Sequence, residues 1–453
     1  MNNTDEKNFE PGVLPFRPYI YDVRSAGDIK NLTAPPYDVI SKELQDDLYG
    51  RSEYNIVRLE FGKEEGGDGG AENKYKRAAL LFNEWISKGI LKREDKDSIY
   101  IYVQKFTADN VSYERIGFLS LFRLPETKEN GSIYGHEATL SKPKEDRFKL
   151  MEAANANFSP IFSVFEDKNS DVLNILKKSM EDGAAEKLFD FTDDNGIINV
   201  LWRLGGEAVI AHIQSAMAHK PVYIADGHHR FETCINYRDY VKKEGLDKKG
   251  INADSCLMYF APSNQDGLVI LPTHRGIKGK NISIENLLES IKDNFDYKET
   301  NFDDLINENK KSGKNSVSFG FAHKSGRAFI LSFRENGRNK ENEGKEGGGK
   351  NANPLEGLDV SVLQENILKK ALGITQEEID TQKYLVYEKD PQKALDKVKR
   401  GGLEAVFFTN PTKIEDVIKI ASLNLRMPQK STYFYPKIIS GLVVNPLIKQ
   451  SLF

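Results

Sequence analysis

The densest group of potentially reactive side chains lies at Asp226–Arg230, where the sequence reads Asp-Gly-His-His-Arg. The apolar run Pro221–Ala225 comes directly before it and predicts a short buried strand. Apolar residues then recur at helical spacing from Phe231 to Val241. The group therefore stands where a strand ends and a helix begins. At such a place the first backbone amides and the positive end of the helix dipole favour phosphate binding.

Each residue type in this group suits an oxyanion or its counter-ion. The imidazoles of His228 and His229 and the guanidinium of Arg230 match the oxygens of a tetrahedral phosphate. Gly227 allows close approach of the backbone, and Asp226 is suited to hold a substrate group or a Mg²⁺ ion. The plainer alternative is a turn with an aspartate cap and surface histidines, but His-His-Arg is uncommon at a helix start. Zinc is disfavoured, because adjacent histidines do not readily face one ion.

A second group combines His136 and Glu137 with the charged run Lys142–Arg147. A histidine beside a glutamate could supply a general base, and Arg147 could contact phosphate. The alternative interpretation is a solvated, charged loop.

Three more groups carry polar or rigid residues. Thr273, His274 and Arg275 follow an apolar run, and Lys430, Ser431 and Thr432 place an ammonium beside two hydroxyls, which suits phosphate oxygens. Ala34–Ile40 (APPYDVI) holds two prolines that make an extended segment ahead of Tyr and Asp, and it is either a rigid binding loop or a turn. The common phosphate cradle G-x-x-x-x-G-K-[ST] and the protein-kinase motifs do not occur in the sequence.

The elements that must position these groups are short strands and intervening helices. Strands are predicted at Tyr54–Phe61, Ser98–Phe106, Arg115–Phe122, Ile161–Phe165, Pro221–Ala225, Cys256–Phe260, Leu268–Leu271, Ser316–Ala322, Arg327–Phe333 and Glu404–Phe408. Helices are predicted at Asn73–Lys88, Asp171–Glu181, Glu207–Ala218, Ile284–Asn294, Val360–Leu372, Gln392–Lys399 and Lys413–Leu423. The mixture predicts an α+β or mixed α/β fold, without the regular alternation of a barrel or doubly wound sheet.

Composition limits the possible classes of protein. The 453 residues include 64 Lys and Arg against 68 Asp and Glu, a net charge of −4, which gives no reason to expect nucleic acid or anionic membrane as the main partner. Two cysteines cannot form a disulfide framework or a four-thiolate zinc site. The polar N-terminus is unlike a signal peptide, and no apolar stretch reaches membrane-spanning length. We therefore expect a cytoplasmic protein.

Two segments, Gly62–Asn73 and Glu335–Pro354, are rich in Gly, Glu, Lys and Asn. Neither can bury enough apolar area to offset the entropy of ordering, so both are predicted to be mobile loops, the second a disordered insertion.

Several motifs together resemble the DUF1015 family of bacteria and archaea. They are APPYDVI at Ala34–Ile40, NIVRLEFG at Asn55–Gly62, HEAT at His136–Thr139, DR at Asp146–Arg147, ANFSPIF at Ala156–Phe162, IADGHHRFET at Ile224–Thr233, LPTHR at Leu271–Arg275 and MPQKSTYFYPKIISGLVVNPL at Met427–Leu447. The ADGHHR segment also resembles the ParB/sulfiredoxin-like superfamily, and within it the free L-serine kinases, which carry a DGHHR loop. This resemblance implies transfer of a phosphoryl group to free L-serine, giving O-phosphoserine, with Mg²⁺. The implied donors are ADP, ATP or pyrophosphate, and long DUF1015-type chains are similar to the pyrophosphate-using kind.

The resemblance also implies roles for residues. Asp226, His228, His229 and Arg230 match the loop that holds the transferred phosphate and the serine hydroxyl, and the segment Lys430–Thr432 matches one that approaches the same site. The catalytic base of the family is a glutamate after a histidine, which matches Glu137, with Glu60 as the second choice. A carboxylate is needed because the serine hydroxyl is a poor nucleophile at neutral pH.

The expected organisation is an N-terminal α/β region at 1–130, a ParB/sulfiredoxin-like core at 131–280 and a C-terminal region at 281–453. Three other functions stay open at this point. A phosphoserine phosphatase or phosphotransferase would use the same residues. A ParB-like nucleotide- or DNA-binding protein should show a helix-turn-helix and a basic face, which the sequence lacks. A sulfiredoxin-like reductase needs a cysteine in the loop, whereas Cys234 comes one helical turn later. L-serine and a small phosphate donor are the expected partners, and the oligomeric state stays open.

Overall fold

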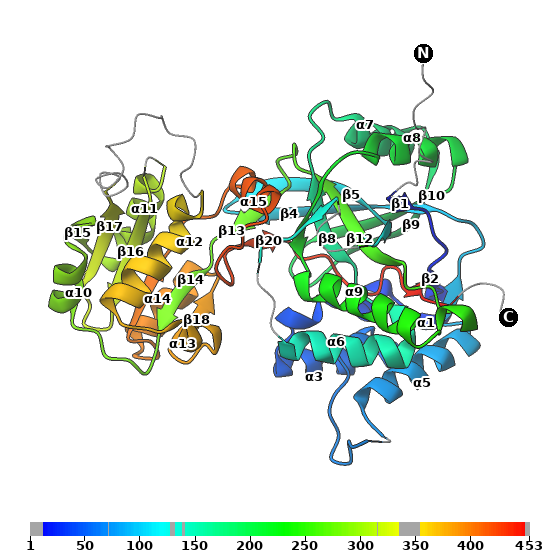
Figure 1. Cartoon of the computed structure of the whole chain (residues 1–453), viewed down its shortest axis with the longest axis horizontal. Helices are drawn as coiled ribbons and strands as arrows, with labels where there is room; N and C mark the ends of the chain where they lie inside the picture. The colour runs from blue at the N-terminus through cyan, green and yellow to red at the C-terminus, as the bar shows by residue number, and fades with distance from the viewer. Residues whose placement is uncertain are drawn as a thin grey trace. The chain divides into compact units, whose positions relative to one another are not determined.

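The computed structural model describes residues 12–70, 72–126, 132–137, 141–314, 316–334 and 354–448. The chain forms two compact units (Figure 1). Unit 1 comprises residues 1–135, 139–269 and 436–453, and unit 2 comprises residues 136–138 and 270–435. Both units contain helices and strands, which confirms the predicted mixed α/β class. The finer division at residues 130 and 280 stays a prediction.

Within the described residues, unit 1 is built on a nine-stranded sheet with the order β6-β11-β8-β12-β5-β4-β10-β9, in which β1 pairs with β5. Its strands, together with the short pairs outside this sheet, are β1 (Val13–Leu14), β2 (Tyr19–Tyr21), β3 (Leu91–Arg93), β4 (Ile99–Ala108), β5 (Val111–Arg123), β6 (Ile133–Tyr134), β7 (Ala156–Asn157), β8 (Ile161–Phe165), β9 (Ala185–Thr192), β10 (Ile198–Leu204), β11 (Val222–Asp226), β12 (Ser255–Pro262) and β21 (Asn445–Pro446). Two pairs of strands are parallel: β6 with β11, and β8 with β12. The antiparallel pairs are β8 with β11 and each neighbouring pair along β12-β5-β4-β10-β9.

The long hairpin β4–β5 explains how the middle of the sheet forms. Its turn residues, Asp109 and Asn110, both have positive φ (48° and 63°), the backbone that a tight two-residue hairpin requires. The register from Ala108–Val111 to Tyr100–Leu119 follows directly from this turn. The sheet is therefore set by local sequence at its centre.

The helices of unit 1 follow, and α2, α7, α8 and α9 among them contact this sheet. They are α1 (Val23–Ala26), α2 (Ile29–Leu32), η1 (Tyr37–Val39), α3 (Lys42–Arg51), α4 (Val57–Glu60), α5 (Lys74–Ser87), α6 (Ser141–Ala154), α7 (Asp171–Glu181), α8 (Glu207–Met217), α9 (His228–Lys243) and η2 (Asp247–Lys249). Apolar residues of α7, α8 and α9 share one core with Phe118, Met258 and Phe260 of the sheet. Helix α9 contacts β8 and β12, and α6 lies beside α9 (Figure 1).

Unit 2 has an antiparallel sheet of six strands among its described residues, in the order β15-β17-β16-β19-β14-β18, and a separate pair, β13 with β20. The strands are β13 (Val269–Leu271), β14 (His274–Ile277), β15 (Phe295–Thr300), β16 (Ser318–His323), β17 (Ala328–Phe333), β18 (Leu385–Glu388), β19 (Ala405–Phe408) and β20 (Tyr433–Tyr435). The helices are α10 (Ile284–Ile291), α11 (Phe302–Ser312), η4 (Pro354–Gly357), α12 (Asp359–Val362), η5 (Leu363–Ala371), α13 (Gln376–Asp380), α14 (Pro391–Lys399) and α15 (Ile414–Ser422).

One predicted strand, Tyr54–Phe61, is wrong, because the segment forms helix α4. The buried side chain of Asn55 explains the difference. Its Oδ1 accepts the amide of Val57 at 2.9 Å, and its Nδ2 donates to the carbonyls of Asn31 and Thr33 at 2.7 and 3.0 Å. An asparagine that caps a turn in this way overrides the strand preference of the apolar residues after it. The loop alternative for Lys142–Arg147 is also wrong, because the segment lies in helix α6.

The structure describes most of one of the two Gly-rich segments that were predicted to be mobile, and almost none of the other. In the described part of Gly62–Asn73, Arg77 donates to the carbonyl of Lys63 at 2.8 Å and pairs with Asp68, and the amide of Gly69 donates to the carbonyl of Glu72 at 2.7 Å. The loop therefore has fixed internal contacts. Of Glu335–Pro354, residues 335–353 lie outside the described residues, so the prediction of a disordered insertion is not addressed.

Among the helices of the described residues, none has both the length and the apolar character that crossing a membrane requires.

The centre of the sheet should not tolerate a side chain at Gly117 of β5. A Cβ there would lie 2.5 Å from Cζ of Tyr259 and still closer to the carbonyl oxygen of Phe260, so a neighbouring strand must shift. We expect Gly117→Ala to lower the free energy of unfolding by about 1–3 kcal/mol, as overpacking commonly does. Urea denaturation of the full chain measures it.

Gly50→Ala is the matched control, because Gly50 lies in helix α3 with no other atom within 4 Å of its Cβ position. This change should leave stability equal or raise it, since alanine favours helix. Equal stability of the two variants would contradict the packing described at Gly117.

Candidate functional site

The loop at Asp226–Arg230 has the predicted structure. β11 ends at Asp226, Gly227 has a left-handed backbone with φ of 91°, and α9 begins at His228. The amide of Phe231 is the first to bond back within the helix, to the carbonyl of Gly227 at 3.0 Å, so the amides of residues 228–230 belong to its first turn. Glycine is required at 227 for two reasons: its positive φ, and the Nε of Arg230, which would lie 2.8 Å from a Cβ.

Two cations hold the carboxylate of Asp226. The guanidinium of Arg230 donates to Oδ2 at 2.7 Å, and the ammonium of Lys437 contacts Oδ1. The side chains of Asp226, Arg230 and Lys437 are only 13, 8 and 10 % exposed. Burial raises the pKa of Asp226, but Lys437 and then Arg230 outweigh it and lower that pKa to about 2. Asp226 is therefore ionised over the whole physiological range.

The two histidines differ in exposure. His228 is 6 % exposed and lies close enough to Asp226 to contribute to its lowered pKa. His229 is half-buried, and its carbonyl accepts the hydroxyl of Thr233 at 2.8 Å. The alternative of two surface histidines is thus wrong for His228.

A second polar group in unit 1 gathers around Arg147. Its Nη1 donates to the carbonyl and to Oε1 of Glu60, at 2.7 and 3.2 Å, and its Nε donates to Asp146 at 3.0 Å. The guanidinium stacks on the ring of Tyr37, 4.1 Å from its centroid. The APPYDVI segment is therefore part of this group through Tyr37. Arg147, predicted as a phosphate contact, is 6 % exposed and bonded to the protein itself.

Glu60 is the buried carboxylate of this group, at 2 % exposure. Its Oε1 also accepts the hydroxyl of Ser159 at 2.7 Å. Burial raises the pKa of Glu60, and Arg147 and Ser159 oppose this only in part. The neighbouring Asp146 shows the opposite balance, because Arg147 and Lys74 outweigh its burial and lower its pKa to about 2.

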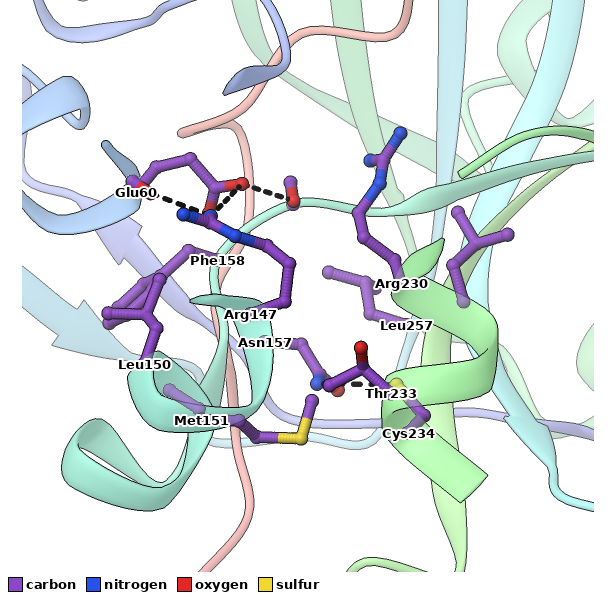
Figure 2. A pocket seen from close by; sticks show the side chains of 13 residues that line it. Glu60, Arg147, Leu150, Met151, Asn157, Phe158, Arg230, Thr233, Cys234 and Leu257 are labelled. Atoms are coloured by element: carbon purple, nitrogen blue, oxygen red, sulfur yellow. Dashed lines mark hydrogen bonds and ion pairs between the residues drawn. The ribbon is translucent and has the colours of Figure 1, made fainter. Parts of the chain in front are cut away.

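A cavity of about 40 Å³ connects the Asp226 loop with the Arg147 group. It is lined by Glu60, Arg147, Leu150, Met151, Ala156, Asn157, Phe158, Ser159, Ile161, Arg230, Thr233, Cys234 and Leu257. Figure 2 shows Arg147 and Met151 of α6 on one side and Arg230, Thr233 and Cys234 of α9 on the other. This volume holds a few water molecules.

The ANFSPIF segment forms the bridge between the two groups. The hydroxyl of Ser159 donates to Glu60, and the next residue, Pro160, accepts the guanidinium of Arg230 on its carbonyl. Motifs that lie far apart in the sequence therefore meet around one cavity of unit 1. Glu60, the second choice of base from sequence, therefore lines the same cavity as Arg230 of the Asp226 loop.

The remaining predicted residues gather in unit 2. His136 Nε2 lies 3.1 Å from the hydroxyl of Thr432, and Glu137 accepts the amide of Lys430 at 2.9 Å. Arg275 donates to the carbonyl of Lys430 at 3.1 Å. Three separately predicted groups thus form one cluster.

Buried polar groups hold this cluster of unit 2 in place. His274 Nδ1 accepts the amide of Thr409 at 3.3 Å, and the carbonyl of Thr273 accepts the hydroxyl of Thr409 at 3.0 Å. Ser431 donates its hydroxyl to the carbonyl of Pro428 at 2.5 Å. Burial lowers the pKa of His274 to about 4 and that of Arg275 to about 10. His274 is therefore neutral at physiological pH.

Mg²⁺ was expected at Asp226, but both oxygens of that carboxylate already contact cations, Arg230 and Lys437. Within the part of the chain that the structure describes, no three His, Cys, Asp or Glu side chains gather into a potential metal site. The residues present do not fit a metal ion held by Asp226. The requirement for Mg²⁺ stays a prediction.

Lys437 is the site residue that sequence reasoning missed. It stands at the end of the YFYPK run, a few residues after the predicted phosphate-binding segment Lys430–Thr432. Its partner Asp226 lies 211 positions earlier in the sequence. A lysine after an aromatic run is the only signal in the sequence, and spacing alone could not pair it with Asp226.

Asp226→Asn should destabilise the chain in a pH-dependent way. It leaves Arg230 and Lys437 without their shared carboxylate, so we expect a loss of about 3–5 kcal/mol at neutral pH. Because folding depresses the pKa of Asp226 from 3.8 to about 2, the part of this loss that depends on ionisation, about 2–3 kcal/mol, is present above pH 4 and disappears as the pH falls toward 2. Thermal unfolding of both proteins across this range measures the difference.

Asp239→Asn is the control, because Asp239 pairs with Arg238 on the same helix but is 61 % exposed. This variant should lose less than about 1 kcal/mol of free energy of unfolding. A cost for Asp226→Asn that is equally small, or that does not change with pH, would contradict the ion pairs described here.

The chain matches a known protein family over most of its length. The family described as "Protein of unknown function (DUF1015)" matches residues 13–361. No curated protein sequence matches the chain.

Similar solved structures include a free serine kinase in complex with AMP (13% identity, 71% of this chain and 90% of that chain, TM-score 0.35). A conserved hypothetical protein from Pyrococcus furiosus has 13% identity, 70% and 89% coverage and a TM-score of 0.33. SbnI with a C-terminal truncation, from Staphylococcus aureus, has 11% identity, 72% and 87% coverage and a TM-score of 0.34. At such identities and TM-scores, the likeness says nothing further about this chain. The family match covers most of the sequence, so the chain belongs to the DUF1015 family.

Proposed function

We propose that this protein is a phosphotransferase that moves a phosphoryl group to the hydroxyl of free L-serine and so forms O-phosphoserine. The observation that carries the proposal is the Asp226–Arg230 loop, where two buried cations and the start of α9 meet at one strand end. Phosphoryl transfer depends on positioning and on charges aimed at the phosphate oxygens. The residue-by-residue match to the DGHHR loop of the serine kinases supports serine as the acceptor.

The proposed base is Glu60, the second choice from sequence, rather than Glu137. Glu60 lines the same cavity as Arg230, and burial raises its pKa, which makes its carboxylate a stronger proton acceptor. Ser159 and Arg147 fix the orientation of this carboxylate. Glu137 instead accepts the amide of Lys430 in unit 2.

The proposed reaction balances without a further reactant. The serine oxygen forms a bond to phosphorus while the bond between phosphorus and the leaving oxygen of the donor breaks. The hydroxyl proton passes to Glu60. The start of α9 with His228, His229 and Arg230 stabilises the phosphoryl oxygens. Mg²⁺, where the donor needs it, would come with the donor's phosphate oxygens rather than from a protein-held site.

Pyrophosphate is the proposed donor, with ADP and ATP as alternatives. A small donor needs charged contacts rather than a purine pocket, and ion pairs join Arg147 with Glu60 and Asp226 with Arg230 and Lys437 in unit 1. The same residues would serve the reverse reaction, so a phosphoserine phosphatase stays an alternative. Participation of the unit 2 residues Lys430–Thr432, a ParB/sulfiredoxin-like core and a cytoplasmic location stay predictions from sequence.

A sulfiredoxin-like reductase is disfavoured by the position of the cysteines. Cys234 is 6 % exposed and Cys256 is fully buried, and their thiols are in contact. The contact with Cys234 and then burial raise the pKa of Cys256, which makes its thiol less reactive.

The function is tested by incubating the full-length protein with L-serine, Mg²⁺ and either pyrophosphate, ADP or ATP. We expect O-phosphoserine, detected by mass spectrometry, with pyrophosphate giving the fastest formation. If O-phosphoserine forms only with ADP or ATP, that nucleotide replaces pyrophosphate as the donor and the proposal of a serine kinase stands. The absence of product with all three donors would refute the kinase.

The base is tested by comparing Glu60→Gln with Glu137→Gln. Glu60→Gln should lower kcat by about 10²–10⁴, because an amide cannot accept the serine proton. In the wild type, kcat should fall as the pH drops toward the raised pKa of Glu60, because the protonated group is inactive.

Glu137→Gln serves as the matched control, with circular dichroism to verify that both variants are folded. It should change kcat by less than about tenfold. A larger loss in Glu137→Gln than in Glu60→Gln would restore Glu137 as the base.

A further inference from the structure

Lys437 reaches the Asp226 loop from the C-terminal segment of unit 1. We propose that Lys437 contacts the phosphate of the donor directly, and that Arg115 and Gln104 are positioning residues that set its place. The inference rests on the proposed function, since the anion is taken to be the phosphoryl donor.

Charge is the first argument. Asp226, Arg230 and Lys437 together carry one more positive than negative charge, and each side chain is at most 13 % exposed. The first turn of α9 adds partial positive charge at the same place. A phosphate oxygen that binds there would be a further anionic partner for these two cations. An ammonium has three donors, so Lys437 can contact a carboxylate and a phosphate oxygen together.

The backbone on both sides of the Lys437 α-carbon is held by two buried side chains. Nη2 of Arg115 donates to the carbonyl of Pro436 at 2.5 Å, and Nε2 of Gln104 donates to the carbonyl of Lys437 at 3.2 Å. Arg115 and Gln104 are opposite each other in the β4–β5 register, and Arg115 also donates to Gln104. These bonds determine which residue of the C-terminal segment faces Asp226.

The two positioning residues belong to a larger polar row that crosses the sheet. Asn199 of β10 accepts Nε2 of Gln104 at 3.3 Å and the hydroxyl of Tyr102 at 2.6 Å. The guanidinium of Arg115 lies 4.7 Å from the ring centroid of Phe162, which is the partner of Asp226 in the β8–β11 register. The row therefore connects the sheet centre with the strand that carries the loop.

Burying Arg115 is costly, and its burial lowers its pKa. Apolar side chains alone could have covered the sheet at less cost, but they would not fix the register of an irregular segment. The polar row fixes the register of the C-terminal segment, because a shift of that segment by one residue would move Lys437 away from Asp226. This is why we assign Arg115 and Gln104 to positioning rather than to general stability.

The test measures binding of pyrophosphate to the full chain by isothermal titration calorimetry, with EDTA present to remove metal ions. Lys437→Met should weaken binding about 10–100-fold, as expected for one charge-assisted contact. Asp226→Asn should weaken binding less than Lys437→Met does, because it keeps the ammonium and removes a negative charge beside the anion. If the ion pair were only structural, both variants would weaken binding alike, since both break the same pair.

The matched control is Lys220→Met. Lys220 pairs with the buried Asp167 at 2.6 Å, just before the opposite end of β11, so the change removes an equivalent ion pair. Pyrophosphate affinity should not change. Circular dichroism verifies that each variant is folded.

The positioning role of Arg115 is tested by comparing its effect on pyrophosphate binding in the wild type and in the Lys437→Met variant. Arg115→Met should weaken pyrophosphate binding in the wild type but add little in the Lys437→Met background, whereas a general loss of structure would weaken both equally. Wild-type affinity in Lys437→Met would overturn the inference and leave the proposed function standing. Failure of the wild-type protein to bind pyrophosphate at all would also overturn the inference, whereas O-phosphoserine formed from a nucleotide would still support the proposed function.

Discussion

The structure of unit 1 depends on one buried carboxylate shared by two cations. Asp226 ends β11, Arg230 stands one turn into α9, and Lys437 comes from the far end of the sequence. A buried carboxylate without such partners would be protonated or would not be tolerated. The ion pairs therefore hold a strand end, a helix start and the C-terminal segment together, and they leave positive charge at the place where an anion would bind.

Segments that are far apart in sequence converge on this carboxylate and on the cavity beside it. The segment around Ser159 and Pro160 contacts Glu60 on one side and Arg230 on the other. Arg147 links Glu60 with Asp146 and Tyr37. The result is a buried acid with a raised pKa close to a group of cations, which is the combination that proton removal and phosphate stabilisation both need.

Local sequence was sufficient to predict the loop but not its surroundings. The strand, the glycine and the helix at 221–243 are each encoded by neighbouring residues, so their order and position could be predicted. Helix α4 was mistaken for a strand because its composition is apolar, and the capping side chain of Asn55 acts through bonds to residues more than twenty positions away. Lys437 was not grouped with the loop for the same reason: its contact is long-range and leaves no periodic pattern. Glu60 was only the second choice of base.

Unit 2 collects the other predicted residues into a cluster whose described bonds are largely to its own backbone. Arg275 donates to the carbonyl of Lys430, and Glu137 accepts the amide of Lys430. Lys430 itself has a positive φ of 56°, which shows that these contacts hold a tight bend rather than an extended strand. These motifs were predicted separately and meet in unit 2, and their part in the reaction stays a prediction.

The most direct measurement of the central claim is a crystal structure of the full chain grown with pyrophosphate or phosphate. We predict anion density at the start of α9, within hydrogen-bond distance of the amides of residues 228–230 and of the Lys437 ammonium. Anion density confined to other parts of the chain, with the start of α9 covered by the protein's own side chains, would contradict it.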